Sequence, residues 1–253
     1  LSNYLTFLLK RLVRLYPVYL FIVTMITLTV WSGFDYRHFP DASTWYHWWM
    51  NFRLDFPEYL RNAFFVHINL GGVTWTLRVI LLATPILPFL YLLSKKLNWT
   101  WSLLFSLLLV CASFNLLNFP NFRDFRYLYM FFLGLVLPQF KTVFDSLKPF
   151  MFYLISPLLL YFFFVIRYQT DEYVGGVFET IASFVMLGVI LYQPKVRLFD
   201  FLDHKLFVYL GRISYSLYLV HFSVLYALAR IVLQFFSFLP LSSNYLLVHT
   251  LLF

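Results

Sequence analysis

Two arginines near the start of the chain have the spacing of a phosphate-binding pair. Arg11 and Arg14 lie in "KRLVRLYPVYL", and at positions i and i+3 both guanidinium groups project from one side of a helix. Paired arginines bind phosphate through forked, bidentate hydrogen bonds that lysine cannot match, and an acyl-coenzyme A would bring several phosphates. The ordinary alternative is a positive-inside anchor at the membrane surface.

A second group of polar side chains interrupts an apolar run late in the chain. The stretch "GRISYSLYLVHFSVL" carries Ser214, Tyr215, Tyr218 and His221. In a bilayer each of these groups costs free energy unless a partner satisfies it. On a helix Ser214, Tyr218 and His221 share one face, which favours a lined cavity. A lone histidine among apolar residues can otherwise serve as an interhelical hydrogen-bonding group.

A third motif, "GGVTWTLRVILLATP", lies between these two. Gly71 and Gly72 permit a tight turn, and Trp75 and Thr76 then stand where the chain meets the membrane from outside. Taken alone this motif predicts an interfacial anchor. The sequence shows no Ser-His-Asp order and no cysteine or histidine grouping with metal-ligand spacing, so we expect neither a catalytic triad nor a metal site.

The composition determines the surroundings in which these motifs must work. Hydrophobic residues make up 62% of the 253 residues and charged residues 12%, and the mean hydropathy is +0.77. These values predict an all-α, polytopic transmembrane bundle, because a span needs about 20 apolar residues and the runs do not alternate as barrel strands would. Candidate spans lie near 15–31, 79–93 (interrupted by Pro85 and Pro88), 100–117, 126–140, 149–166, 174–192 and 206–235, with another beginning near 243.

The lysines give an orientation. If Leu1 to Arg14 is cytoplasmic, alternation of the spans puts every lysine of the chain on the cytoplasmic side: Lys10, Lys95, Lys96, Lys141, Lys148, Lys195 and Lys205. The connection over 32–78 is then extracytoplasmic, with tryptophans that suit a partly helical, interfacial cap. The net charge of +8 indicates topology and attraction to anionic lipid rather than nucleic-acid binding.

Taken together and in this order, the motifs resemble a known family, the membrane-bound acyltransferases called acyltransferase family 3. The matching stretches are "RLVRLYPVY", "VTWTLRV", "YMFFLGLVLP" after Arg126, and "GRISYSLYLVH". The last is specific, and the order and spacing of all four extend the match over nearly the whole chain. We therefore expect residues 1–253 to form a single acyltransferase-like domain. We expect this domain to be truncated at both ends. Counting the apolar spans by length gives about eight helices, whereas the resemblance implies roughly ten.

The resemblance implies transfer of an acyl group, commonly acetyl, from a cytoplasmic acyl-coenzyme A to a hydroxyl of a surface polysaccharide or lipid-linked sugar. It places the protein in the bilayer of a bacterial cytoplasmic membrane and implies a donor substrate rather than a bound cofactor. Residue by residue it makes Arg11, Arg14 and His221 the catalytic candidates. Trp75, Ser214, Tyr215 and Tyr218 become candidates for binding substrate.

Two departures from the family pattern matter. The family's proposed general base is a histidine on the first helix, which the match places before Leu1, so His221 does not take that role. The tryptophan motif of the family ends in an acid where this chain has Ile80. Either activity is lost or the chain belongs to a divergent subgroup.

Two functions of other classes remain open at this point. One is a transporter or glycan-lipid flippase, in which Arg11, Arg14, Glu179 and His221 line a path across the membrane. No inverted repeat supports it. The other is an inactive relative that binds sugar or scaffolds envelope proteins, which Ile80 would explain.

Overall fold

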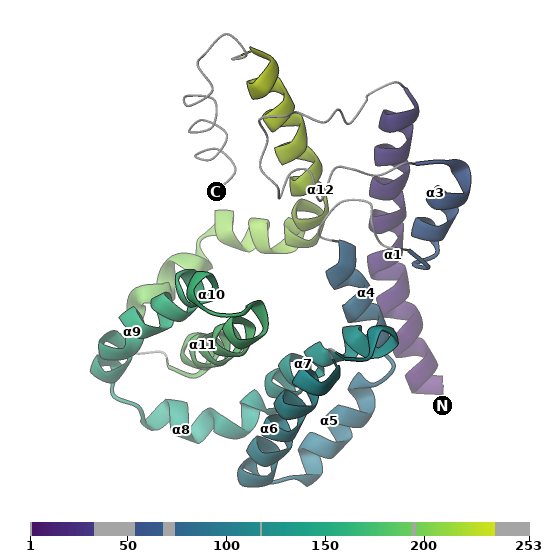
Figure 1. The fold of residues 1–253 in the computed structure, drawn as a ribbon. Helices are drawn as coiled ribbons and strands as arrows, with labels where there is room; N and C mark the ends of the chain where they lie inside the picture. Colours follow the sequence, from purple (N-terminus) through teal and green to yellow (C-terminus); the bar gives the residue numbers. More distant parts are fainter. Residues whose placement is uncertain (1, 33–53, 68–73, 117, 194–195, 236–253) are drawn as a thin grey trace. The chain divides into compact units, whose positions relative to one another are not determined.

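The chain folds into helices throughout the part that the structure describes. The computed structural model describes residues 2–32, 54–67, 74–116, 118–193 and 196–235, and every regular element within these ranges is an α-helix or a short 3₁₀ helix (Figure 1). The all-α expectation is therefore confirmed.

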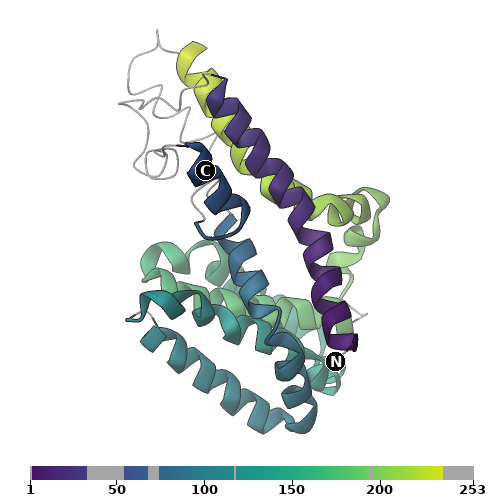
Figure 2. The same cartoon turned by 90° about the vertical axis from the view of Figure 1, so that its right-hand side faces the viewer.

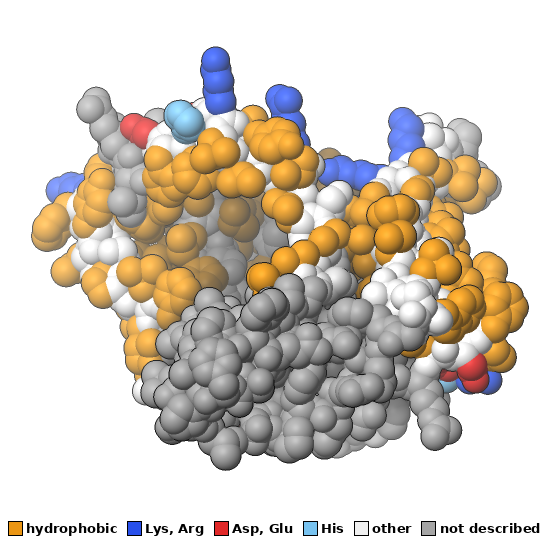
Figure 3. All heavy atoms as spheres, turned by 90° about the horizontal axis from the view of Figure 1, so that it is seen from above, with side chains coloured by type: hydrophobic (Ala, Val, Ile, Leu, Met, Phe, Trp, Pro, Cys, Tyr) orange, Lys and Arg blue, Asp and Glu red, His pale blue; other side chains and the backbone are white. Residues whose placement is uncertain are grey.

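The long helices have the length and composition of membrane spans. Among the described residues four segments qualify, Asn3–Trp31, Trp99–Leu116, Asp124–Ser146 and Tyr173–Tyr192, and a fifth is added if the pair Thr74–Ala83 and Leu87–Lys96 is one broken span. Their surfaces are apolar: on the face shown in Figure 3, hydrophobic side chains form most of the described surface and charged ones are few. Apolar patches of this extent mark a surface covered by another apolar phase, here lipid. The chain is a polytopic integral membrane protein.

Two compact units make up the fold. One combines residues 1–80 with residues 209–253, and the other comprises residues 81–208. The first unit contains α1 (Ser2–Trp31), α3 (Phe56–Ala63), most of α4 (Thr74–Ala83) and most of α12 (Lys205–Phe235). The elements bearing the arginine pair, the tryptophan motif and the late histidine therefore belong to one unit, although 210 positions separate Arg11 from His221.

In the first unit α3 lies against the second half of α1 (Figures 1 and 2). The helix begins after Asp55, whose side chain caps it by accepting a 2.8 Å hydrogen bond from the Glu58 backbone N–H. Trp31 donates to the Leu54 carbonyl at 2.9 Å, and Tyr19 donates to the Asn62 carbonyl at 2.7 Å. Increasing residue number in α3 thus meets decreasing number in α1, so the two helices run antiparallel.

The second unit packs shorter helices around two apolar clusters. Its elements in chain order are α5 (Leu87–Lys96), α6 (Trp99–Leu116), η1 (Pro120–Tyr127), α7 (Leu128–Val136), η2 (Leu137–Phe140), α8 (Lys141–Ser146), α9 (Pro149–Phe164), α10 (Ile166–Gln169), α11 (Glu172–Tyr192) and η3 (Arg197–Asp203). Phe132 and Val136 are fully buried where α7 meets α5 and α6. Phe144 and Ala182 belong to the second cluster, where α11 meets α8 and α9.

Two glutamine side chains, one of them buried, bond to helix ends that apolar neighbours could not satisfy. Gln193 is buried and donates to the carbonyls of Phe144 and Leu147 at 2.7 and 2.6 Å. The last carbonyls of a helix have no partner within the helix, and lipid offers none, so a side-chain donor is needed there. Gln139 does the same for α5 by donating to the carbonyls of Ser94 and Leu97.

The sequence predicted the positions of the apolar helices more accurately than the residues at which they begin and end. The interruption near Pro85 is confirmed, because α4 and α5 are separate helices with three residues between them. The first span was predicted near 15–31, and the helix that contains it begins earlier, at Ser2, and continues through Pro17. The run predicted over 149–166 forms a helix of only 16 residues followed by α10. The span expected from residue 243 and most of the connection over 32–78 lie outside the described residues.

Candidate active site

The arginine pair stands on a continuous helix. Arg11 is half-buried and its guanidinium carbon lies 5.6 Å above the Phe7 ring, a cation–π contact. Arg14 is exposed and close enough to Arg11 for the two charges to interact. Because two adjacent cations repel, the arrangement gains free energy when an anion binds between them.

The late helix contacts α1 directly beside this pair. Tyr215 donates a hydrogen bond of 2.7 Å from its hydroxyl to the carbonyl of Leu15, the residue after Arg14. The Tyr215 side chain is half-buried. The structure therefore places the Tyr215 hydroxyl at the residue that follows Arg14 in the chain.

The tryptophan motif joins the same unit through a second hydrogen bond. The hydroxyls of Thr76 and Tyr218 lie 2.6 Å apart, which links α4 to α12. Leu77 and Val79 are buried at 1% and 6% exposure and hold this turn of α4 in the protein. Trp75, a predicted substrate-binding residue, is 37% exposed at the start of the helix.

The other two predicted residues of α12 turn toward their own helix. Ser214 donates to the Gly211 carbonyl at 2.8 Å, and Nδ1 of His221 lies 2.5 Å from the Tyr218 carbonyl. The ring of His221 also packs against that of Tyr218 at a centroid distance of 5.6 Å. Of the three residues predicted to share one face and line a cavity, Tyr218 makes a tertiary contact, to Thr76. The pattern did not identify Tyr215, whose bond to α1 comes from a neighbouring face.

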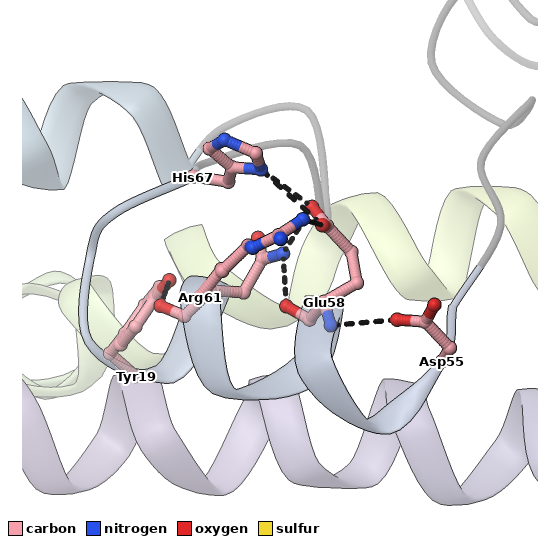
Figure 4. A network of polar contacts seen from close by, with 6 residues as sticks. Tyr19, Asp55, Glu58, Arg61 and His67 are labelled. Carbon is pink, nitrogen blue, oxygen red and sulfur yellow. Dashed lines mark hydrogen bonds and ion pairs between the residues drawn. The ribbon is translucent and has the colours of Figure 1, made fainter.

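Sequence reasoning missed a polar network on α3. The Glu58 carboxylate lies 3.1 Å from Nδ1 of His67 and 3.2 Å from a guanidinium nitrogen of Arg61. The amide of Asn62 donates to the Glu58 carbonyl at 2.9 Å and to its carboxylate at 3.3 Å. Figure 4 shows His67 and Arg61 converging on Glu58 above α1, with Tyr19 beside them. The available signal was the capped helix start at Asp55, after which Arg61 and Asn62 follow Glu58 at i+3 and i+4, on the same side of the helix.

The second unit holds a polar group of its own around Arg126, three residues before the apolar "YMFFLG" motif. Its guanidinium carbon lies 4.6 Å from the Tyr127 ring centroid and 4.5 Å from that of Tyr173, and the Tyr127 hydroxyl accepts one of its hydrogen bonds. This arrangement ties η1 to α11 by cation–π contacts.

No group of three histidine, cysteine or acidic side chains with metal-binding geometry occurs in the part of the chain described here. The first unit holds the arginine pair on α1, the linked hydroxyls of Thr76 and Tyr218, and the Glu58–His67 pair, formed by α3 and the turn that follows it.

A comparison with family models matches residues 1–253 to the family described as "Acyltransferase domain", which is acyltransferase family 3. The chain belongs to this family, and the protein is a membrane acyltransferase. Comparisons with the curated proteins and with the solved structures give no match.

Proposed function

We propose that this protein is an O-acyltransferase. It transfers an acyl group, an acetyl group in the simplest case, from a cytoplasmic acyl-coenzyme A to a hydroxyl of a surface polysaccharide or lipid-linked sugar. The membrane would be a bacterial cytoplasmic membrane, and the donor is a substrate rather than a bound cofactor. Membership of the acyltransferase family supports acyl transfer in general.

One observation carries the proposal furthest: motifs from three distant parts of the sequence meet in one unit. Tyr215 bonds to the residue next to Arg14, and Thr76 of the tryptophan motif bonds to Tyr218. Motifs that only anchored separate helices would not need these contacts. A site assembled from residues of α1, α4 and α12 requires them.

The arginine pair suits the donor. Guanidinium groups one turn apart can each form two parallel hydrogen bonds to a phosphate, and the exposure of Arg14 leaves it accessible. The neighbouring phenols of Tyr215 and Tyr218 are hydroxyl groups of the kind that can stabilise a developing oxyanion. Binding of the donor by Arg11 and Arg14 would then place its thioester toward α12.

The test uses the full-length parent protein in membranes with radiolabelled acetyl-coenzyme A, following label into the envelope glycan and lipid fractions. Arg14→Lys keeps the charge and loses the fork, so we expect transfer to fall about ten- to a hundredfold at equal protein abundance, the worth of a charged hydrogen bond. Lys10→Arg on the same helix is the matched control and should retain the wild-type rate. Wild-type transfer in Arg14→Lys would make the pair a topology anchor, and substrate movement without transfer would favour a transporter.

A further inference from the structure

A series of contacts shows how far α3 and the turn after it follow α1. Each step forward along this segment meets an earlier residue of α1. The contacts, in the order of α3, are Leu54 with Trp31, Tyr59 with Thr24, Asn62 with Tyr19, and Phe65 with Tyr16. Fifteen residue steps separate Trp31 from Tyr16, which is about 22 Å along a helix axis. Residues 54–65 therefore accompany α1 over a length comparable with most of a ~30 Å hydrocarbon core.

The part of α1 that α3 follows is its apolar part. From Tyr16 to Trp31 the helix carries no charged residue, and this stretch belongs to a segment with the length and composition of a membrane span. The charged residues of α1 all precede it: Lys10, Arg11 and Arg14. Because the basic end of a span stays cytoplasmic, the Trp31 end is extracytoplasmic. A segment that runs from the level of Trp31 to that of Tyr16 therefore goes inward from the outer surface.

One face of α3 is apolar and exposed. Phe56, Leu60 and Phe64 are 58%, 38% and 68% exposed and follow one another at intervals of four residues, so they form one stripe along the helix. The buried Asn62 lies on the side toward α1, where its carbonyl accepts the hydrogen bond of Tyr19. A row of large exposed apolar side chains marks a surface that another apolar phase covers, and at the depth of a span that phase is lipid.

A second face of the same segment is charged. Glu58 and Arg61, at i and i+3, form an ion pair, and the turn after α3 returns His67 to the same carboxylate (Figure 4). The side chains of Arg61 and His67 are 53% and 52% exposed. Ionisable side chains at membrane depth face the protein interior or water rather than lipid, and backbone outside a helix is tolerated there on the same condition. Because protein leaves half of each side chain uncovered, water must reach this face.

We infer that residues 54–67 re-enter the membrane beside α1 and that their charged face lines a water-accessible path from the extracytoplasmic side for the acceptor. The acceptor's part in this inference rests on the proposed function. The ligand class that suits this face is a polyhydroxylated, sugar-like molecule. The carboxylate of Glu58 accepts hydrogen bonds, Arg61 donates them, and sugar hydroxyls do both. A sugar is too polar to cross lipid, so it needs such a path to meet a thioester presented from the other side of the membrane.

The experiment uses the full-length protein in intact cells, with Cys111→Ala as the background. Arg61→Cys and His67→Cys probe the charged face, and Leu60→Cys and Phe64→Cys are the matched controls on the apolar stripe. A charged maleimide that cannot cross the membrane, added from outside, should label positions 61 and 67 and leave positions 60 and 64 unlabelled. Equal labelling of all four positions would place α3 in water outside the membrane, and absence of labelling at 61 and 67 would close the path. Either result would overturn the inference.

Acyl transfer provides the second readout. In Arg61→Cys a bulky impermeant maleimide should block transfer and a small one of the same charge should block less of it, since the path is narrowed rather than the protein unfolded. His67→Cys gives the same comparison at a second position. Labelling without loss of transfer would overturn the acceptor path. Absence of transfer by the wild type would overturn the proposed function and the acceptor path with it, while the labelling pattern would still decide the re-entrant position of residues 54–67.

Discussion

The hydroxyl of Tyr215 donates a 2.7 Å hydrogen bond to the carbonyl of Leu15, a residue 200 positions earlier in the chain. The contact joins the late helix to the first helix beside the arginine pair. A carbonyl inside a helix already accepts one backbone hydrogen bond, and its second lone pair is free for a side chain. Tyr215 uses that lone pair without disturbing α1.

Tyr215→Phe removes this bond and little else. We expect a loss of about 1 kcal/mol in stability and a fall in acyl transfer of up to about tenfold, because the neighbouring helix is then less firmly placed. Thermal unfolding in detergent micelles and transfer assays in membranes measure the two effects. Tyr209→Phe on the same helix, where the side chain is 58% exposed, is the control. Equal effects of both substitutions would show that the Leu15 contact has no special role.

Thr76 and Tyr218 should be energetically coupled. Each makes further contacts, so a single substitution cannot isolate the 2.6 Å bond between them. A double-mutant cycle of Thr76→Val and Tyr218→Phe should give a coupling free energy of about 0.5–1.5 kcal/mol, the net worth of one hydrogen bond. Additive effects on the unfolding midpoint would mean that α4 and α12 are held by other contacts.

The order of the helices could be predicted because apolar runs and breaking prolines are local signals. The interruption at Pro85 and the helix of α12 follow from composition within about 20 residues. The span predicted near 15–31 covers only the apolar part of α1, because Lys10, Arg11 and Arg14 were taken as the membrane boundary, whereas the helix begins at Ser2. A charged stretch of good helix formers continues a helix beyond the bilayer, and hydropathy does not report this.

The site was only partly predictable because its contacts join distant segments. Spacing put Ser214, Tyr218 and His221 on one face, yet Tyr215 makes the bond to α1. Nothing in local sequence shows that Phe65 adopts a positive φ or that His67 turns back to Glu58. Those positions depend on the stacking of Phe65 on Tyr19, a contact that only the packing of α3 on α1 creates.

Gly188 should not tolerate a side chain. A Cβ added there would lie 2.1 Å from the buried ring of Phe144, which joins α8 to α11. Gly188→Ala should therefore cost about 1–3 kcal/mol through overpacking and lower the yield of inserted protein. Gly134→Ala is the matched control in another helix of the same unit, because nothing lies within 4 Å of its added Cβ. It should be neutral or stabilising by up to about 1 kcal/mol, and a destabilised control would contradict the packing argument.

The lysine distribution predicts that the end of α5 faces the cytoplasm. Lys95 and Lys96 lie in the last turn of this helix. A cysteine introduced as Lys96→Cys in a Cys111→Ala background should react with a membrane-permeant maleimide. It should not react with an impermeant one applied to intact cells. Labelling of position 96 by the impermeant reagent from outside would reverse the assigned orientation.

Ile80 provides a test of the departure that the sequence resemblance implies. It is half-buried on α4, one turn after Thr76, in the register where the resemblance implies an acid. If that acid orients a cationic group or receives a sugar hydroxyl, Ile80 leaves a polar partner unmatched, at about 1–3 kcal/mol for a buried group. That free energy corresponds to about five- to 150-fold in rate if it falls wholly on the transition state.

We therefore expect Ile80→Glu in the full-length parent to raise acyl transfer, with Ile80→Gln as the uncharged control of similar size. A lone carboxylate against lipid costs several kcal/mol, so inserted protein and turnover must be measured together. Equal abundance with unchanged or lower turnover in Ile80→Glu would mean that the site is built around isoleucine.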